Sequence, residues 1–146
     1  MNNPRKSSCF FVLSVLFCSL LINGCGSSAV KKIRINNVSI LAEVVDSDLT
    51  RQRGLMFRER LSENGGMLFV FDKLARYSFW MKNMLIPLDI IWIGQDKTIV
   101  DITKNALPCE KDCASIIPAA LSQYVLEVNS GFADKNQFKV GDKVNF

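Results

Sequence analysis

The stretch GMLFVFDKLARYSFWMKNMLIPLDIIWI, from Gly66 to Ile93, decides how this chain folds. It contains three apolar, aromatic-rich runs, each with the length of a β-strand. Isolated polar side chains interrupt these runs, chiefly Lys82, Asn83 and Asp89. A polar group on an apolar strand costs free energy unless it is paired or takes part in binding. The stretch therefore predicts a β-rich core and marks these three residues as candidates for a site.

Short strands are expected on both sides of this stretch. Residues 30–45 read as two strands joined by a turn at Asn36 and Asn37, a pair that favours hairpins. A short helix follows, with Ser47 among its capping residues and Gly54 at its end. The remaining expected strands are 67–71, 77–83, 88–93, 98–104, 123–129 and 143–146, with a helical turn over 131–138. This pattern predicts a mainly β fold, a compact barrel or sandwich of short strands with one or two short helices.

The N-terminus has the pattern of a bacterial lipoprotein signal peptide. Arg5 and Lys6 form a positive region, and the apolar run 9–22 follows it. This run is 14 residues long, which suits a signal peptide, whereas a bilayer span needs about 20 residues. The sequence LINGC at residues 21–25 then resembles a lipobox, in which Cys25 is acylated and becomes the new N-terminus.

Three regions follow from this interpretation: a signal peptide over residues 1–24, a lipid-anchored tether over 25–30, and a single β-rich domain over 31–146. We expect the domain to lie in the cell envelope, outside the cytoplasm and attached to a membrane. Since Gly26 is not the aspartate that retains lipoproteins in the inner membrane, the expected place in a Gram-negative cell is the periplasmic face of the outer membrane. Asn23 departs from the usual lipobox, so the alternative is an uncleaved N-terminal anchor with an incidental cysteine.

The charge of the mature chain gives no support to nucleic-acid binding. Loss of Arg5 and Lys6 lowers Lys+Arg from 18 to 16 against 14 Asp+Glu, so the net charge is +2 instead of +4. The remaining basic pair, Lys31 and Lys32, follows the tether and suits weak contact with anionic lipid. The expected partner is therefore a membrane and not a nucleic acid.

The chain has no histidine, which excludes Ser-His-Asp and Cys-His catalysis and the usual zinc enzymes. Beyond the cysteines of the signal region, Cys109 and Cys113 remain. In an oxidising envelope such a close pair most simply forms a disulfide across a loop. A redox-active pair and a two-thiolate metal site are the alternatives, although redox motifs place two residues between the cysteines and a metal site needs further ligands. We expect no metal and no cofactor.

Several short motifs occur in order along the chain. They are RGLM at 53–56 with Arg58 behind it, GMLF at 66–69, FWMKN at 79–83, PLDII at 87–91, and YVLEVN at 124–129 with Gly131. Together they resemble the signature of the bacterial and archaeal domain of unknown function 192 family, over residues 33–146. The resemblance implies a small β-rich fold that is often exported or lipid-anchored, and it implies no activity. Met84 departs from the threonine or similar residue expected at its position.

The candidate ligand site is a set of polar residues around Trp80. It comprises Arg53, Arg58, Lys82, Asn83, Asp89 and Glu127. We expect a small polar ligand there, anionic, sugar-like or derived from the cell wall. Two of these residues have structural alternatives: Asn83 as a buried amide that ties a loop to the sheet, and Asp89 in an ion pair with Arg53 or Arg58.

Three other functions are consistent with the sequence, although we expect a binding or interaction module in preference to an enzyme. Asp89 and Glu127 are the acid and base of an envelope hydrolase if they face each other across a cleft at roughly 5–9.5 Å. Four methionines offer thioether ligands for Cu(I), although methionine more often fills gaps in a core. They are Met56, Met67, Met81 and Met84. The third is a structural partner of another envelope protein.

Replacement of Cys25 by serine is expected to abolish lipid attachment, because the thiol that carries the acyl group is lost. The measurement is incorporation of an alkyne-labelled fatty acid, together with the partition of the protein between membrane and soluble fractions. Cys18→Ser is the control, since Cys18 lies within the predicted signal peptide and its loss leaves labelling unchanged. Labelling that persists in Cys25→Ser contradicts the lipoprotein prediction.

Overall fold

Seven strands and two short helices occur in residues 29–146, the part of the chain that this computed structural model describes. In order they are β1 (Val30–Ile35), β2 (Val38–Val45), α1 (Asp48–Arg53), β3 (Gly65–Ala75), β4 (Leu88–Ile93), β5 (Ile99–Ala106), β6 (Ser122–Asn129), α2 (Phe132–Lys135) and β7 (Val144–Asn145). The predicted signal peptide and Cys25 lie outside the described residues. The turn at Asn36, the helix before Gly54 and most strands lie where the sequence predicts them.

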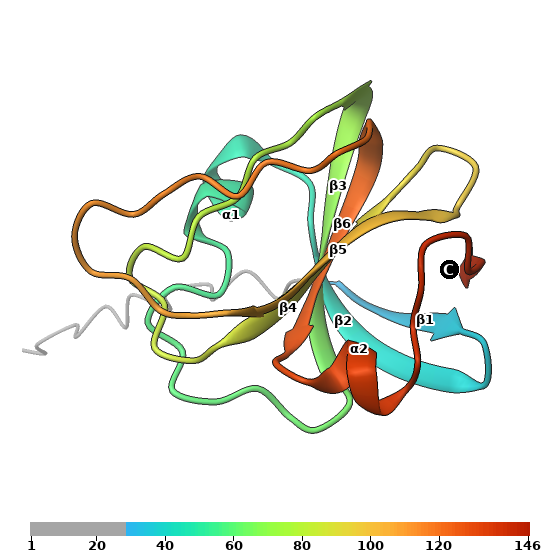
Figure 1. Ribbon diagram of the computed structural model, residues 1–146, viewed down its shortest axis with the longest axis horizontal. Coiled ribbons are helices and arrows are strands. Elements are labelled where there is room, and N and C mark those ends of the chain that lie inside the picture. Colours follow the sequence, from blue (N-terminus) through green and yellow to red (C-terminus); the bar gives the residue numbers. More distant parts are fainter. Residues whose placement is uncertain (1–28) are drawn as a thin grey trace, which may run out of the picture.

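All seven strands belong to one sheet, in the order β5-β4-β6-β3-β2-β1-β7. Neighbouring strands are antiparallel except β2 and β3, which run parallel and are joined by a crossover that contains α1. The sheet curls until its outer strands approach each other, since Thr98 beside β5 forms a bridge with Lys143 beside β7. Figure 1 shows this curled half-barrel, with α1 and the loops after β3 and β5 on the left and α2 at the lower end. The prediction of a mainly β, barrel-like fold is confirmed.

Two hydrophobic cores lie on the two faces of this sheet. The inner face packs around α2 and Phe138, and the outer face of β3, β4 and β6 packs under the loops after α1, β3 and β5. Every residue of β4 is buried, with Ile91 and Ile93 in the inner core and Ile90 and Trp92 in the outer one. This double coverage explains why the sequence of β4 is almost continuously apolar.

Residues 77–83 form no strand, and here the sequence prediction is wrong. The segment is extended but makes only isolated bridges, to Ile116 and Cys109 in the loop after β5. Only one face of the segment is covered, since Trp80 is 50% exposed and Lys82 lies in solvent. Alternating side chains indicate an extended chain, but they do not reveal whether a partner strand runs beside it.

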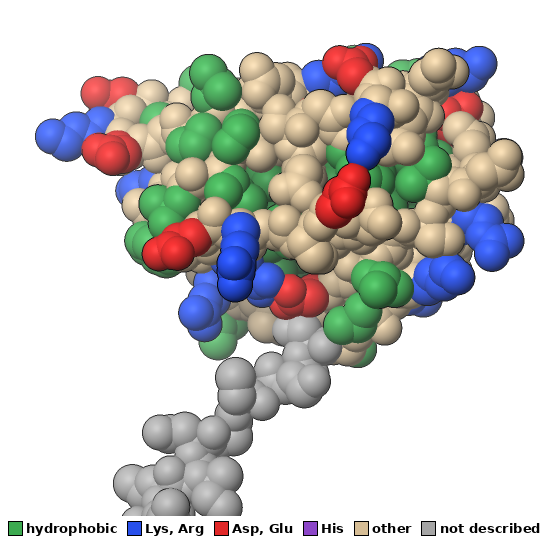
Figure 2. All heavy atoms as spheres, turned by 90° about the horizontal axis from the view of Figure 1, so that it is seen from below, with side chains coloured by type: hydrophobic (Ala, Val, Ile, Leu, Met, Phe, Trp, Pro, Cys, Tyr) green, Lys and Arg blue, Asp and Glu red, His purple; other side chains and the backbone are tan. Residues whose placement is uncertain are grey.

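The surface mixes charges of both signs. On the face shown in Figure 2, lysine and arginine side chains lie among aspartates and glutamates and form no single-sign patch. Surface ion pairs contribute to this mixture, such as Lys135 with Glu63 at 2.9 Å. A nucleic-acid backbone is bound by a continuous positive surface, which this face does not offer.

Asp89 is fully buried on the inner face and is held by backbone amides. Its Oδ1 accepts hydrogen bonds from the N–H groups of Asn105 (2.9 Å) and Gly131 (3.1 Å). Its Oδ2 accepts a hydrogen bond from the N–H of Ala133 at 2.8 Å. Asp89 therefore joins the end of β5 to the first turn of α2 and fastens this helix to the sheet.

Asp89→Asn is expected to lower the free energy of unfolding by about 3 kcal/mol, because the carboxylate that accepts three amide hydrogen bonds becomes a neutral amide with one acceptor atom. Urea unfolding followed by far-UV circular dichroism measures the change. Asp72→Asn is the matched control, because Asp72 is exposed on β3 and its replacement is expected to change stability by less than about 0.5 kcal/mol. Equal effects of the two substitutions would contradict the structural role of Asp89.

Candidate functional site

A pocket of about 270 Å³ lies on the outer face of the sheet, between α1 and residues 77–84, which we name the wall segment. Strands β3 and β6 contribute its floor, and Met56 and Met84 belong to its apolar lining. Most of the remaining wall is aromatic: Phe69, Phe71, Tyr77, Phe79 and Trp80.

The aromatic walls are held by contacts among themselves and with β4. The rings of Phe71 and Tyr77 stack with their centroids 3.5 Å apart. The rings of Phe69 and Phe79 meet edge to face at 4.9 Å. The indole N–H of Trp92 donates a hydrogen bond of 2.8 Å to the Tyr77 carbonyl, which ties the wall segment to β4. The pocket is therefore formed before any ligand arrives.

Glu127 lies in the middle of β6 and lines the floor of this pocket. It pairs with Met67 of β3 and Ile90 of β4, whose side chains share its face of the sheet, and only 4% of it is exposed. Its Oε2 atom has no hydrogen-bond partner among the described residues. Burial raises the pKa of the Glu127 carboxyl to about 8, so the group is mostly protonated at neutral pH.

Two arginines of α1 line the mouth of the pocket. Arg51 is fixed, because its guanidinium donates to the Val70 carbonyl at 2.8 Å and to the Asp48 carboxylate at 2.6 Å. It also lies 5.1 Å from the centre of the Phe71 ring. Arg53 is exposed and forms no ion pair within the described part of the chain. The pocket thus combines an acidic floor with a basic mouth.

Local sequence explains the place of α1. Ser47 and Thr50 form a reciprocal capping box, in which the Ser47 hydroxyl accepts from the Thr50 N–H and the Thr50 hydroxyl accepts from the Ser47 N–H. Gly54 ends the helix with a left-handed φ of 48°, and an added Cβ there would lie 3.4 Å from the Phe69 ring. The helix therefore ends directly against the pocket.

Of the seven residues predicted for a ligand site, three line this pocket: Arg53, Trp80 and Glu127. Lys82 lies outside it, with its ammonium 5.6 Å from the centre of the Trp80 ring. Arg58 forms a two-point ion pair with Glu43, and these hydrogen bonds hold the pKa of the Glu43 carboxyl below its usual value. Because this ion pair holds Arg58 at Glu43 of β2, the Arg58 side chain is not free to bind a ligand in the pocket.

The structural alternative for Asn83, a buried amide that ties a loop to the sheet, holds only in part, because Asn83 is half-buried and its backbone joins two loops. Its φ of 60° lies in the left-handed region that asparagine tolerates. Its N–H donates to the Cys109 carbonyl at 3.2 Å, and its carbonyl accepts from the Phe57 N–H at 2.9 Å. Asn83 therefore ties together the loops after α1 and β5.

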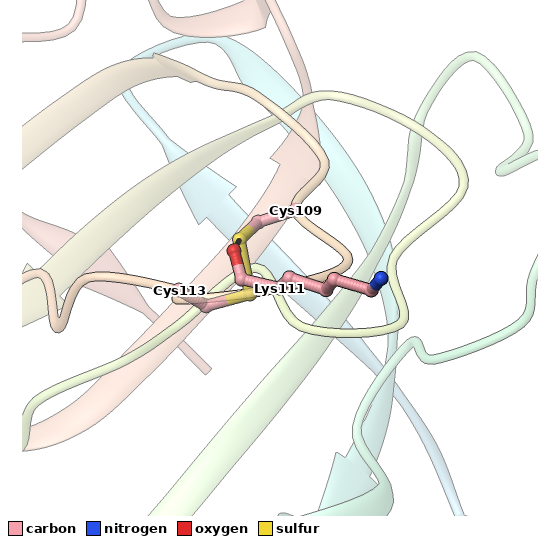
Figure 3. Close-up of a disulfide and its surroundings, with 3 residues drawn as sticks. All are labelled: Cys109, Lys111 and Cys113. Atoms are coloured by element: carbon pink, nitrogen blue, oxygen red, sulfur yellow. Dashed lines mark hydrogen bonds between the residues drawn. A yellow bond between two sulfur atoms is a disulfide. The ribbon is translucent and has the colours of Figure 1, made fainter.

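Cys109 and Cys113 form a disulfide, as the sequence predicts, with Cα atoms 5.6 Å apart. Figure 3 shows this bond and the side chain of Lys111, which points away from it. The Cys109 N–H donates to the Met81 carbonyl at 3.0 Å. The disulfide loop therefore braces the wall segment.

Asp89 and Glu127 lie on opposite faces of the sheet. Glu127 pairs across the strands with Ile90, the residue after Asp89, and successive residues of a strand point to opposite faces. The expected ion pair of Asp89 with Arg53 or Arg58 is wrong, since backbone amides bind this carboxylate instead. A hydrolase that uses the two carboxylates as a pair has no geometric support in this fold.

The methionines pack in the outer core. Met67, Met81 and Met84 are buried there, and Met56 packs against the same cluster. Filling a core is the common role of methionine, so their burial accounts for their presence. Among residues 29–146 no group of three or more Cys, Asp or Glu side chains is placed to hold a metal ion. Nor does this region contain a helix with the length and hydropathy of a membrane span.

Sequence reasoning missed the residues that shape the pocket, namely Arg51, Phe71 and Tyr77. The sequence marks polar residues in an apolar stretch as candidates, and this criterion passes over aromatic walls. The available signal was the aromatic residue on each side of the largely polar segment 72–76. Such a pair can stack when the chain folds back on itself.

Comparison with known proteins identifies the family. Residues 31–146 match the DUF192 family, described as an uncharacterised ACR. This chain belongs to the DUF192 family. A UPF0127 protein of Pyrococcus abyssi is 26% identical over 106 residues, which cover 71% of this chain and 84% of the relative.

Two solved structures share the fold. A protein of unknown function from Novosphingobium aromaticivorans is 31% identical with a TM-score of 0.76, and the match covers 80% of this chain and 85% of that one. A Sinorhizobium meliloti protein named as a "putative transcription regulator" is also 31% identical with a TM-score of 0.76, over 82% of this chain and 95% of its own. These comparisons support the fold. The chemical class of a ligand must be inferred from the geometry of the pocket.

Stability is expected to fall as the pH rises from about 5 to 8. Native Glu127 keeps its proton up to about pH 8, whereas the unfolded chain loses it near 4.5, so the native state binds more protons in this window. The loss is at most about 1.4 kcal/mol per pH unit. Urea unfolding at pH 5, 6.5 and 8 measures it, and Glu127→Gln is expected to flatten the profile because it removes the ionisable group.

The control for this experiment is Glu59→Gln, at an exposed position, which should keep the pH dependence of the wild-type protein. If Glu127→Gln and the wild-type protein follow parallel profiles, another group is responsible for the pH dependence.

Proposed function

We propose that this DUF192 protein is a lipid-anchored binding module of the cell envelope, which holds a small ligand in the pocket above Glu127. The observation that carries the proposal is the Oε2 atom of Glu127, which is buried in the pocket floor with no partner in the described chain. Buried polar atoms nearly always have a hydrogen-bond partner. A ligand with a hydrogen-bond donor would supply the one that this carboxyl lacks.

The lining favours a ligand with an apolar or ring-shaped face. Trp80 is half exposed at the mouth, and Tyr77 and Phe71 offer further aromatic surface beside it. Aromatic faces stack on sugar rings and on other flat groups, which gives contact area with little loss of conformational entropy. Arg53 at the mouth is available to an anionic group at the outer end of the ligand.

Binding fits this pocket better than hydrolysis. The second acidic residue of the lining, Asp48, has 90% of its side chain exposed and is paired with Arg51. General acid and base catalysis of glycoside cleavage requires two carboxyl groups that flank the same bond. Glu127 therefore serves better as a recognition group than as one half of a catalytic pair.

Two further points define the proposal. The Sinorhizobium relative bears the name of a transcription regulator, but the mixed charges of the face in Figure 2 favour a small ligand over nucleic acid. The envelope location rests on the lipobox-like sequence at 21–25 and accords with the disulfide, since such bonds persist in oxidising compartments.

A ligand screen on the full-length protein in detergent tests this proposal. The panel contains cell-wall fragments, sugars, and small aromatic alcohols, amines and acids, and binding is followed by tryptophan fluorescence. We expect at least one class to bind with a Kd below about 1 mM and Trp80→Ala to weaken it about tenfold, because a wall of the pocket is removed. Lys82→Ala is the matched control, since Lys82 lies outside the pocket beside the same ring. A panel without any Trp80-dependent ligand would remove the proposal.

A further inference from the structure

We propose that the pocket selects ligands that carry an ammonium group, which forms an ion pair with the Glu127 carboxylate at the pocket floor. The inference rests on the proposed ligand-binding function and names the chemical class of the ligand. It predicts that a cation binds better than a neutral molecule of the same shape.

Arg51, the fixed cation of the lining, is paired with groups other than Glu127. Its guanidinium donates to the carbonyls of Asp46 and Val70 and to the Asp48 carboxylate. Oε2 of Glu127 has no hydrogen-bond partner among the described residues, although buried polar atoms nearly always have one. A ligand that carries a donor would supply this missing partner.

The surroundings of this carboxyl favour a positive donor over a neutral one. An ammonium group offers three N–H donors and a full charge, and hydrogen bonds between ionised partners are about twice as strong as neutral ones. The faces of aromatic rings attract cations, and five aromatic residues line this pocket. An anion at the floor would instead meet a carboxyl group that its own charge keeps protonated.

The elements that pack around the floor bring few competing charges. Helix α1 contributes Asp48, Arg51 and Arg53, and the wall segment contributes the phenol of Tyr77. Arg51 is neutralised by Asp48 at 2.6 Å. Arg53 is exposed at the mouth, where water and salt weaken its repulsion of a cation.

The neighbouring strands add no free charge beside the carboxyl. On β4 its partner is Ile90, and on β3 its partner is Met67. Beyond Met67 lies Glu43 of β2, which is already paired with Arg58. A cation at the floor would therefore find Glu127 as its counter-ion.

Binding of such a ligand moves one proton. In the free protein burial keeps the Glu127 carboxyl mostly protonated at pH 7. When the ammonium group arrives, the carboxyl proton passes to the buffer, the carboxylate pairs with the cation, and no other covalent bond changes. Affinity should therefore rise with pH up to the pKa of the carboxyl, by up to about tenfold per pH unit.

Isothermal titration calorimetry with benzylammonium and benzyl alcohol tests the inference, because these probes share a shape and differ in charge. The full-length protein in detergent is titrated at pH 7 in phosphate and in MOPS, whose different ionisation enthalpies reveal proton release. We expect benzylammonium to bind at least about tenfold more tightly and to release close to one proton. Glu127→Gln should abolish both the preference and the proton release.

If Glu127→Gln does not fold, the number of protons that the wild-type protein releases on binding benzylammonium still tests the inference. Equal affinities of the two probes, or binding of benzylammonium without proton release, would overturn the inference. If benzyl alcohol then still binds in a Trp80-dependent manner, the proposed binding function stands. Absence of binding by both probes at millimolar concentration also overturns the inference, and the ligand screen separately decides the proposed function.

Discussion

Coverage of the central strands on both faces is the constraint on which the rest of this structure depends. Strands β4 and β6 lie inside the sheet and send alternate side chains into two cores. The inner core closes when the sheet curls around α2, but the outer core needs a second layer. Leaving residues such as Phe69, Trp92 and Val125 in water would forfeit about 25 cal/mol for each Å² of apolar surface. The loops after α1, β3 and β5 supply that layer, and the pocket is the space between them.

The two buried carboxyl groups, Asp89 of β4 and Glu127 of β6, lie in adjacent strands but have different surroundings. Asp89 faces inward and accepts three backbone hydrogen bonds, which offset the loss of water around its charge. Glu127 faces outward into the pocket floor, and its Oε2 has no partner in the described chain. The first carboxyl fastens a helix to the sheet and belongs to the framework. The second keeps its proton because of burial, which is how proteins commonly prepare groups for recognition or chemistry.

Features with a local cause could be predicted from the sequence, and features with a distant cause could not. Asn36 adopts the left-handed turn conformation that asparagine favours, and Ser47 caps α1 within its own first turn. The wall segment alternates like a strand but makes only isolated bridges, because alternation of side chains does not specify a neighbour. The amides that bind Asp89 lie 16 to 44 residues further along the chain, so no local pattern points to them. The sequence shows Glu127 as an acidic residue on an apolar strand, but only tertiary packing places its face of the sheet beneath α1.

Strand β6 enters the sheet between β3 and β4, although it follows both of them in the chain. Until residues 122–129 have been synthesised, β3 and β4 each lack a neighbour on that side, and neither core can close. Contacts between segments so far apart in sequence make folding slow and leave it to the completed chain. The pocket, whose floor contains Glu127 of β6, therefore takes shape only after its other walls have been synthesised.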